Sequence, residues 1–144
     1  MTKIIVLAHG NFPSGILSSL ELIAGKQEDI VGINFLASMS SDDLQNQLLS
    51  ALGDSKRILI LTDLLGGTPF NIASTLSISE EDREIKVLSG LNLAMLIEAA
   101  FSRNNYHELD ALTEKVLSSA QLGVSEFSKC LTEDEEQVEF EGGI

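Results

Sequence analysis

Lys3-Ile4-Ile5-Val6-Leu7-Ala8, followed by His9 and Gly10, is the stretch that decides the fold of this chain. A second aliphatic run, Arg57-Ile58-Leu59-Ile60-Leu61-Thr62, is followed by Asp63. Such runs are typical of strands that are buried on both faces of a parallel sheet, because no alternate position is left for a solvent-exposed face. The sequence therefore predicts two core strands, one followed by His9 and the other by Asp63.

Helical patterns alternate with these strands and with two others. We expect strands at Lys3–Ala8, Ile30–Phe35, Arg57–Thr62 and Glu84–Leu88. Capping and stop signals predict three helices, one from an N-cap at Ser14 to Gly25, one from a cap at Ser41 or Asp42 to Gly53, and one over Pro69–Ile78 with Thr68 as N-cap. Two further helices are expected at Leu91–Ser102 and His107–Leu122, and an extension of the last one toward Leu131 is left open.

Alternating strands and helices predict a single domain over residues 1–144 with right-handed crossovers. The fold class is α/β: a flavodoxin-like three-layer sandwich with a mostly parallel sheet in the order 2-1-3-4 and helices on both faces. Residues 123–144 are expected to hold the end of the last helix and an acidic tail. Because residues 137–141 alternate in polarity, this tail is either an edge strand, within the chain or exchanged in a dimer, or a frayed terminus.

Charge and composition narrow the function classes. The 144 residues carry 22 acidic and 9 basic side chains, a formal charge of -13. That balance argues against binding nucleic acid, which requires a basic face. No apolar stretch approaches the ~20 residues of a membrane span, and no signal-peptide cleavage site follows the first strand. The single cysteine, Cys130, cannot form an internal disulfide, so we expect a cytoplasmic protein.

His9 and Asp63 are the candidate reactive pair. In open parallel sheets, sites form beyond the carboxyl ends of the strands where the strand order reverses, and the order 2-1-3-4 reverses between the strands that precede these two residues. A carboxylate that accepts a hydrogen bond from one imidazole nitrogen fixes the tautomer and leaves the other nitrogen as a nucleophile. Taken alone, His9 could be a structural histidine at a strand end, and Asp63 could only cap a turn. Their predicted proximity is what favours a reactive histidine.

The turn Gly66-Gly67-Thr68-Pro69 predicts a place for a phosphate beside this pair. It opens a helix, and the free N–H groups of a helix N-terminus bind anions. The helix that opens near Ser14 offers a second such terminus, and the turn Gly90-Leu91-Asn92 is expected to form a third wall. We predict no metal site, because Cys130 has no neighbouring ligand and His107 lies in a polar helix entry.

The sequence lacks a complete P-loop and a hydrolase nucleophile elbow. Gly10 to Gly15 has P-loop glycine spacing, but Ile16-Leu17 replaces the required lysine and hydroxyl residues. No Gly-x-Ser-x-Gly nucleophile elbow is present, which weakens a small-hydrolase reading.

The chain resembles the IIA component of the mannose-family (mannose/fructose/sorbose) bacterial sugar phosphotransferase system. His9-Gly10 after an aliphatic strand is similar to the family's phosphorylated-histidine motif. Asp63-Leu64-Leu65-Gly66-Gly67-Thr68-Pro69-Phe70-Asn71 is similar to its Asp-x-x-Gly-Gly-Ser/Thr-Pro-Phe-Asn signature, and Gly90-Leu91-Asn92 to its Gly-x-Asn turn. Ala94 departs from relatives that carry proline there, and the resemblance fades beyond about Leu122.

The resemblance implies a phosphoryl relay without metal or cofactor. Phosphorylated HPr would donate to His9, and His9 would pass the group to a histidine of a IIB subunit on a separate polypeptide, with the membrane subunits IIC and IID as indirect partners. Asp63 would orient His9. The expected phosphoryl-binding residues are Gly10, Ser14, Gly66, Gly67 and Thr68, and the expected pocket wall is Phe12, Pro13, Leu65, Pro69, Asn71, Gly90 and Asn92.

The resemblance also implies a homodimer, because family members are typically dimeric and some exchange a C-terminal strand. Val138 and Phe140 are the candidates for such an exchange. The transported sugar cannot be read from this chain. Two rival functions stay open at this point: a IIA-like phosphoryl donor to a dihydroxyacetone kinase, and a non-enzymatic regulatory binding module that uses the same pocket.

Overall fold

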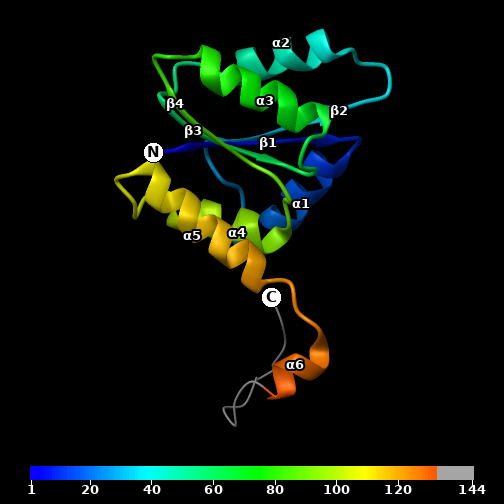
Figure 1. The fold of residues 1–144 in the computed structure, drawn as a ribbon, viewed down its shortest axis with the longest axis vertical. Helices are drawn as coiled ribbons and strands as arrows, with labels where there is room; N and C mark the ends of the chain where they lie inside the picture. Colours follow the sequence, from blue (N-terminus) through cyan, green and yellow to red (C-terminus); the bar gives the residue numbers. More distant parts are fainter. Residues whose placement is uncertain (133–144) are drawn as a thin grey trace.

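A four-stranded, all-parallel sheet in the order β2-β1-β3-β4 forms the centre of the computed structural model, which describes residues 1–132 (Figure 1). Its strands are β1 (Lys3–His9), β2 (Ile30–Phe35), β3 (Arg57–Thr62) and β4 (Glu84–Leu88). The predicted fold class and strand order are confirmed. β1 continues one residue further than predicted, so that His9 is its last residue. The expected strand at 137–141 lies outside the described residues.

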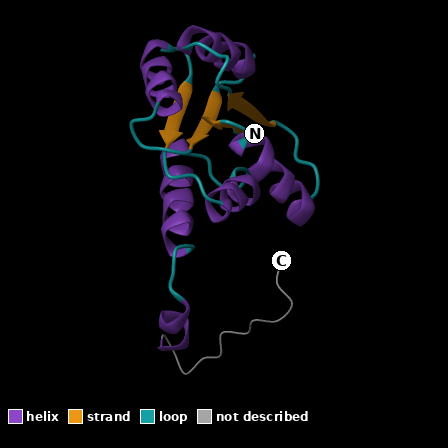
Figure 2. Ribbon diagram, turned by 90° about the vertical axis from the view of Figure 1, so that its right-hand side faces the viewer, coloured by secondary structure: helices purple, strands orange, loops and turns teal. Residues whose placement is uncertain are grey.

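Helices cover both faces of this sheet. α2 (Ser41–Leu52) and α3 (Thr68–Ser79) pack on one face, and α1 (Phe12–Ala24), α4 (Leu93–Ser102) and α5 (Leu109–Leu122) pack on the other (Figures 1 and 2). Alternate strand residues point to opposite faces. Ile4 and Val6 of β1 accordingly pack toward α1, α4 and α5, whereas Ile5 and Leu7 pack toward α2 and α3. Within the two aliphatic runs, residues 4–8 and 58–62 are fully buried, as their composition predicts.

Helix starts differ from prediction by one to three residues. α1 begins at Phe12 after the N-cap Asn11, because the N–H of Gly15 already donates to the carbonyl of Asn11, and Ser14 therefore lies inside the first turn. α3 begins at Thr68 after the N-cap Gly67. Thr68 is thus the first helical residue and Pro69 the second, where a missing N–H costs nothing.

The other helix starts have polar or acidic caps. α2 is capped by Ser40, whose side chain and that of Asp43 form a reciprocal capping box, one residue earlier than the predicted cap. α4 begins after the N-cap Asn92, and α5 begins at Leu109 after the N-cap Glu108. The predicted stops at Gly25 and Gly53 are confirmed as C-caps.

The last long helix does not extend toward Leu131. α5 ends at Leu122, and a separate short helix, α6 (Phe127–Thr132), stands away from the two layers (Figures 1 and 2). A Cβ on Gly123 would lie 2.8 Å from Cβ of Ala94, so only glycine fits this close approach of α5 to α4. Within residues 1–132, no helix has the length and apolar character needed to cross a membrane.

Candidate functional site

The ends of β1 and β3 bring His9 and Asp63 into direct contact. Leu7 pairs with Thr62 in the sheet, so the residues that follow lie side by side. Nδ1 of His9 lies 2.8 Å from Oδ2 of Asp63, and the main-chain N–H of His9 donates to the same oxygen at 3.0 Å. Because an ionised carboxylate only accepts hydrogen bonds, Nδ1 carries a proton and the lone pair of the neutral ring lies on Nε2.

The electrostatics of Asp63 favour its ionised form. Burial raises the pKa of this carboxyl, but hydrogen bonds from the main chain and ring of His9 lower it by more, so that its pKa lies below the ordinary value. The Asp63 side chain is 19% exposed, while that of His9 is 47% exposed. A largely buried carboxylate therefore holds an imidazole ring that is nearly half exposed to solvent.

The turn after Asp63 closes tightly over the His9 ring. Gly66 has φ +78, a conformation that favours glycine, and the side-chain amide of Asn71 donates to its carbonyl at 3.0 Å. A Cβ on Gly67 would lie 3.1 Å from Cε1 of His9. This turn leads directly into α3, whose first N–H groups have no partner within the helix. Gly67 thus lies beside the ring, and Thr68 follows it as the first residue of α3.

The start of α1 borders the ring from the β2 side. Gly10, with φ +58, donates its N–H to the carbonyl of Phe35 at 2.8 Å. The side chain of Asn34 binds Ser14 twice, accepting from its N–H and donating to its hydroxyl, both at 3.2 Å. Ser14 is therefore fixed near the end of β1, with Pro13 buried behind it.

Two residues of this site, Asn34 and Phe35, were missed by the sequence reasoning. The ring of Phe35 lies 5.9 Å from that of His9, measured between ring centroids. Both residues end β2, and the register pairs them with Ala8 and His9. The signal was present, because the predicted order already placed this strand beside the first one.

The loop between β4 and α4 reaches the pair through its main chain. The N–H of Gly90, at φ +76, donates to the carbonyl of Asp63 at 3.2 Å. The side chain of Asn92 instead accepts from the N–H of Met95 and donates to the carbonyl of Ala120. Gly90 is thus brought to Asp63, while the amide of Asn92 is engaged with α4 and α5.

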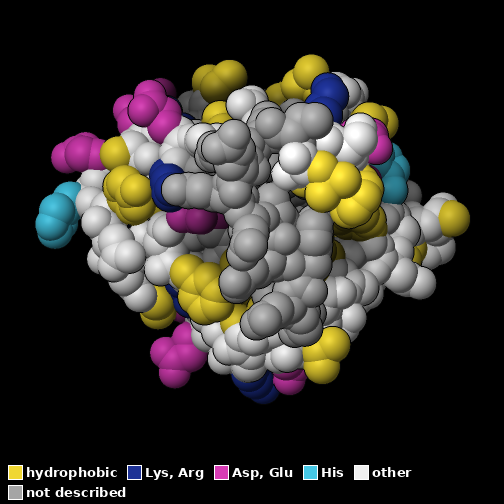
Figure 3. Space-filling view, turned by 90° about the horizontal axis from the view of Figure 1, so that it is seen from below, with side chains coloured by type: hydrophobic (Ala, Val, Ile, Leu, Met, Phe, Trp, Pro, Cys, Tyr) yellow, Lys and Arg dark blue, Asp and Glu magenta, His cyan; other side chains and the backbone are white. Residues whose placement is uncertain are grey.

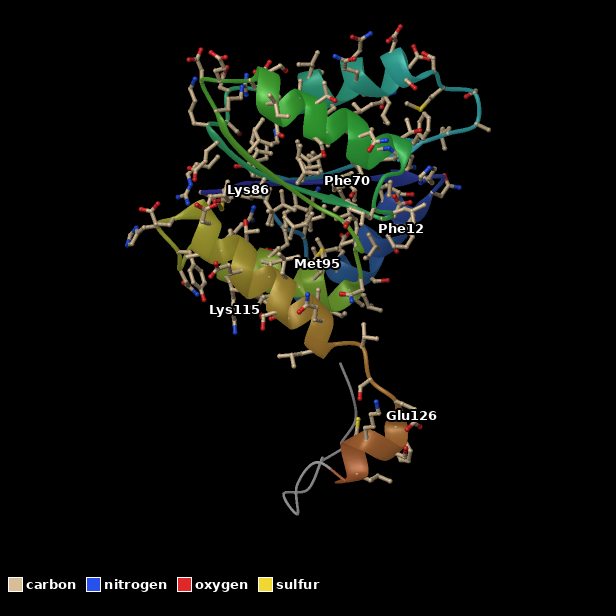
Figure 4. All side chains as sticks on the ribbon, in the orientation of Figure 1. Phe12, Phe70, Lys86, Met95, Lys115 and Glu126 are labelled. Carbon is tan, nitrogen blue, oxygen red and sulfur yellow. The ribbon has the colours of Figure 1, made fainter. Side chains whose placement is uncertain are left out.

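Exposed apolar side chains follow the ends of β1, β2 and β3, the strands beside the His9–Asp63 pair. Phe12 is 42% exposed and, with Leu36, Leu64 and Leu65, forms what we call the apolar rim. Figure 4 shows Phe12 at the end of the sheet where β1 finishes, opposite the end near Lys86. Apart from His9 itself, Asp63 is the single acidic or basic residue in the four segments 9–15, 34–40, 63–72 and 89–93. Among residues 1–132, no group of three or more His, Cys, Asp or Glu side chains is placed to hold a metal ion.

Comparison with known proteins points to one family. A family model described as "PTS system fructose IIA component" matches residues 3–117. The "PTS system fructose-specific EIIA component" of Bacillus subtilis (strain 168) is 30% identical over 124 residues, which cover 84% of each chain. The "PTS system mannose-specific EIIAB component" of Escherichia coli (strain K12) is 31% identical over 84% of this chain, which spans only 38% of that longer protein.

A solved structure agrees with these sequence matches. The phosphotransferase system component EIIA from Streptococcus agalactiae superposes with a TM-score of 0.88 and 59% identity, covering 90% of this chain and 100% of that one. The range of the family model, residues 3–117, includes β1, which ends at His9, and β3, which is followed by Asp63.

Proposed function

Because the chain belongs to the IIA component family of the mannose/fructose/sorbose phosphotransferase systems, we propose that it carries phosphoryl groups for sugar uptake on His9. In this proposal His9 accepts the group from phosphorylated HPr and passes it to a histidine of a IIB subunit, which acts with the membrane subunits IIC and IID. The observation that carries the proposal is the 2.8 Å contact between Nδ1 of His9 and Oδ2 of Asp63. That contact directs the ring lone pair outward.

The proposed step is an in-line exchange of one P–N bond for another. Nε2 of His9 attacks the phosphorus, and the P–N bond to the donor imidazole breaks with its electron pair going to the donor nitrogen. The His9 ring gains positive charge, which the Asp63 carboxylate stabilises. Transfer of this kind depends chiefly on positioning and charge stabilisation, and both are built into the strand ends.

Two helix starts support binding of the transferred group. The N–H groups of Gly66 and Thr68, at the start of α3, are available for the phosphoryl oxygens, while that of Gly67 donates to the carbonyl of Leu64 at 3.0 Å. Gly10 and Ser14 flank the ring at the start of α1, where Ser14 is fixed by Asn34. We assign these five residues to phosphoryl binding. The buried Pro13 and Pro69 shape the two helix starts from behind.

The apolar rim supports docking of other proteins rather than of a small ligand. A histidine on a partner must come within bonding distance of Nε2, which requires an open and partly apolar surface around the ring. Leu64 and Leu65 are 60% and 72% exposed and lie directly after Asp63. Exposed apolar groups of this kind mark interaction sites, and HPr and IIB would use the same rim in turn.

Phosphorylation of His9 is tested by transfer of label from phosphoenolpyruvate through enzyme I and HPr. We expect the wild-type chain to acquire one acid-labile, base-stable phosphoryl group and His9→Ala to acquire none. His107→Ala, which changes an exposed histidine away from the site, is the matched control and should label fully. An unlabelled wild-type chain, or equal label on His9→Ala, would contradict the proposal.

The role of Asp63 is tested by Asp63→Asn, which keeps the shape of the side chain and removes its charge. We expect the transfer rate to fall on the order of a hundredfold, because the amide no longer stabilises the positive ring or selects the tautomer. Circular dichroism should show that the domain stays folded. A rate equal to that of the wild type would remove Asp63 from the mechanism.

A further inference from the structure

Asp63 is held through its main chain by the loop that joins β4 to α4. Besides the bond from Gly90 to the Asp63 carbonyl, the N–H of Leu91 donates to the carbonyl of Thr62 at 3.0 Å. The hydroxyl of Thr62 in turn donates to the carbonyl of Leu88 at 2.8 Å. Through these bonds, the chain after β3 stays attached to the chain after β4 beyond the last residue of that strand. The position of the Asp63 main chain therefore depends on the position of this loop.

Asn92 ties the same loop to two helices. Its Oδ1 accepts from the N–H of Met95 at 2.8 Å and caps α4, and its Nδ2 donates to the carbonyl of Ala120 at 3.0 Å in the last turn of α5. Met95 itself is buried on the α4 side of the sheet (Figure 4). A cavity of about 210 Å³, lined in part by Gly90 and Ala120, lies between the loop and α5. Close packing does not fill this space, which increases the importance of the hydrogen bond across it.

We propose that Asn92 is a positioning residue, which holds the β4–α4 loop against α5 and thereby sets the main chain of Asp63 and the orientation of the His9 ring. Its side chain acts at a distance from the ring, through Gly90 and Asp63. The proposal rests on the proposed function, because orientation of the ring matters only if Nε2 exchanges a group with a partner. It adds a residue to the site whose contribution is indirect, and it gives Asn92 a role other than lining a pocket.

Two substitutions separate the parts of this interaction in the full chain. Asn92→Asp keeps an oxygen that caps α4 but places a carboxylate against the Ala120 carbonyl, while Asn92→Ala removes both bonds. In both variants we expect the pKa of Asp63, followed by carboxyl carbon NMR, to rise toward its ordinary value. We also expect the nitrogen shifts of the His9 ring to show a mixture of tautomers. The phosphoryl transfer rate should fall on the order of tenfold to a hundredfold, with little change in the KM for phosphorylated HPr.

Ser40→Ala is the matched control, because it removes a side-chain cap from α2, in the other helix layer. It should lower the free energy of unfolding by an amount similar to Asn92→Ala, without moving the Asp63 titration or the His9 nitrogen shifts. Unchanged Asp63 titration in both Asn92 variants, or an equal shift in Ser40→Ala, would overturn the proposal. If the wild-type chain accepts no phosphoryl group, the proposed function fails, while the titration and ring measurements still decide the role of Asn92.

Discussion

Oδ2 of Asp63 accepts hydrogen bonds from both the main chain and the ring of His9, so one oxygen fixes the end of β1 and the orientation of its last side chain. The second oxygen, Oδ1, is buried and has no hydrogen-bond partner in the described part of the chain. All of the hydrogen bonding seen for this carboxylate is therefore directed at His9. A small displacement of the ring would weaken two bonds rather than one.

Gly67→Ala tests at the residue scale how closely the turn must approach the ring. The new methyl would lie 3.1 Å from Cε1 of His9 and 3.2 Å from the carbonyl oxygen of Leu64, so the ring or the turn must shift. The backbone φ of -69 is suitable for alanine, so we expect the free energy of unfolding to change by no more than about 1 kcal/mol. The phosphoryl transfer rate should fall on the order of tenfold or more.

Gly15→Ala is the control for this prediction, because it makes the same change near the site with no atom within 4 Å of the new methyl. It should leave the transfer rate close to that of the wild type. Equal rates for Gly67→Ala and the wild type would show that the close approach of the turn has no part in transfer.

Residues of the site differ in how far the sequence could predict them. His9 and Asp63 were predictable because each follows a buried strand and the topology alone makes those strands neighbours. The direction of the Asn92 side chain was not, because it depends on where the last turn of α5 lies, and no local pattern fixes that position. The cap at Thr68 was wrong by one residue, since either Gly67 or Thr68 suits an N-cap and only the backbone path decides between them.

At the element scale, α4 joins the two ends of the sheet. Its start is tied to the loop beside Asp63, and its C-cap, Arg103, is only 4% exposed at the opposite end. The Arg103 guanidinium donates to the carbonyls of Thr2, Glu28 and Asp29, which lie before β1 and β2. Burial lowers the pKa of Arg103, while nearby Asp29 and Glu28 raise it, and the guanidinium stays charged at neutral pH.

Arg103→Met should therefore destabilise the fold without altering the chemistry at His9. It leaves three carbonyls without this donor, and we expect a loss of about 2–3 kcal/mol in the free energy of unfolding, measured with urea. Arg83→Met is a matched substitution at a more exposed arginine that also donates to carbonyls, those of Gly53 and Ser55, and it should cost less. If Arg103→Met and the wild type unfold at the same urea concentration, this account of α4 is contradicted.

At the scale of the whole molecule, the strongly acidic net charge contrasts with the few charged residues in the segments around His9 and Asp63. The formal charge of the chain is -13, but in the four segments around the ring Asp63 is the single charged residue, and it is already bonded to His9. In the proposed function this net charge contributes long-range attraction, because the four segments around the ring carry no charged residue besides Asp63.

The segment from the end of α5 to α6 exposes a second apolar surface, which we assign to self-association. Leu122, Val124 and Leu131 are 80%, 75% and 61% exposed, and all lie on the segment from the end of α5 to α6. Figure 3 is seen from the side on which α6 lies, and it shows exposed hydrophobic side chains there. Such a surface favours burial against a second copy.

We expect light scattering to give twice the 15.5 kDa mass of one chain. A chain with the double substitution Val124→Asp, Leu131→Asp should give the mass of a single chain. Leu22→Asp, at an 89% exposed leucine on α1, is the control and should stay dimeric. A monomeric wild type, or a dimer unaffected by the double substitution, would contradict this assignment.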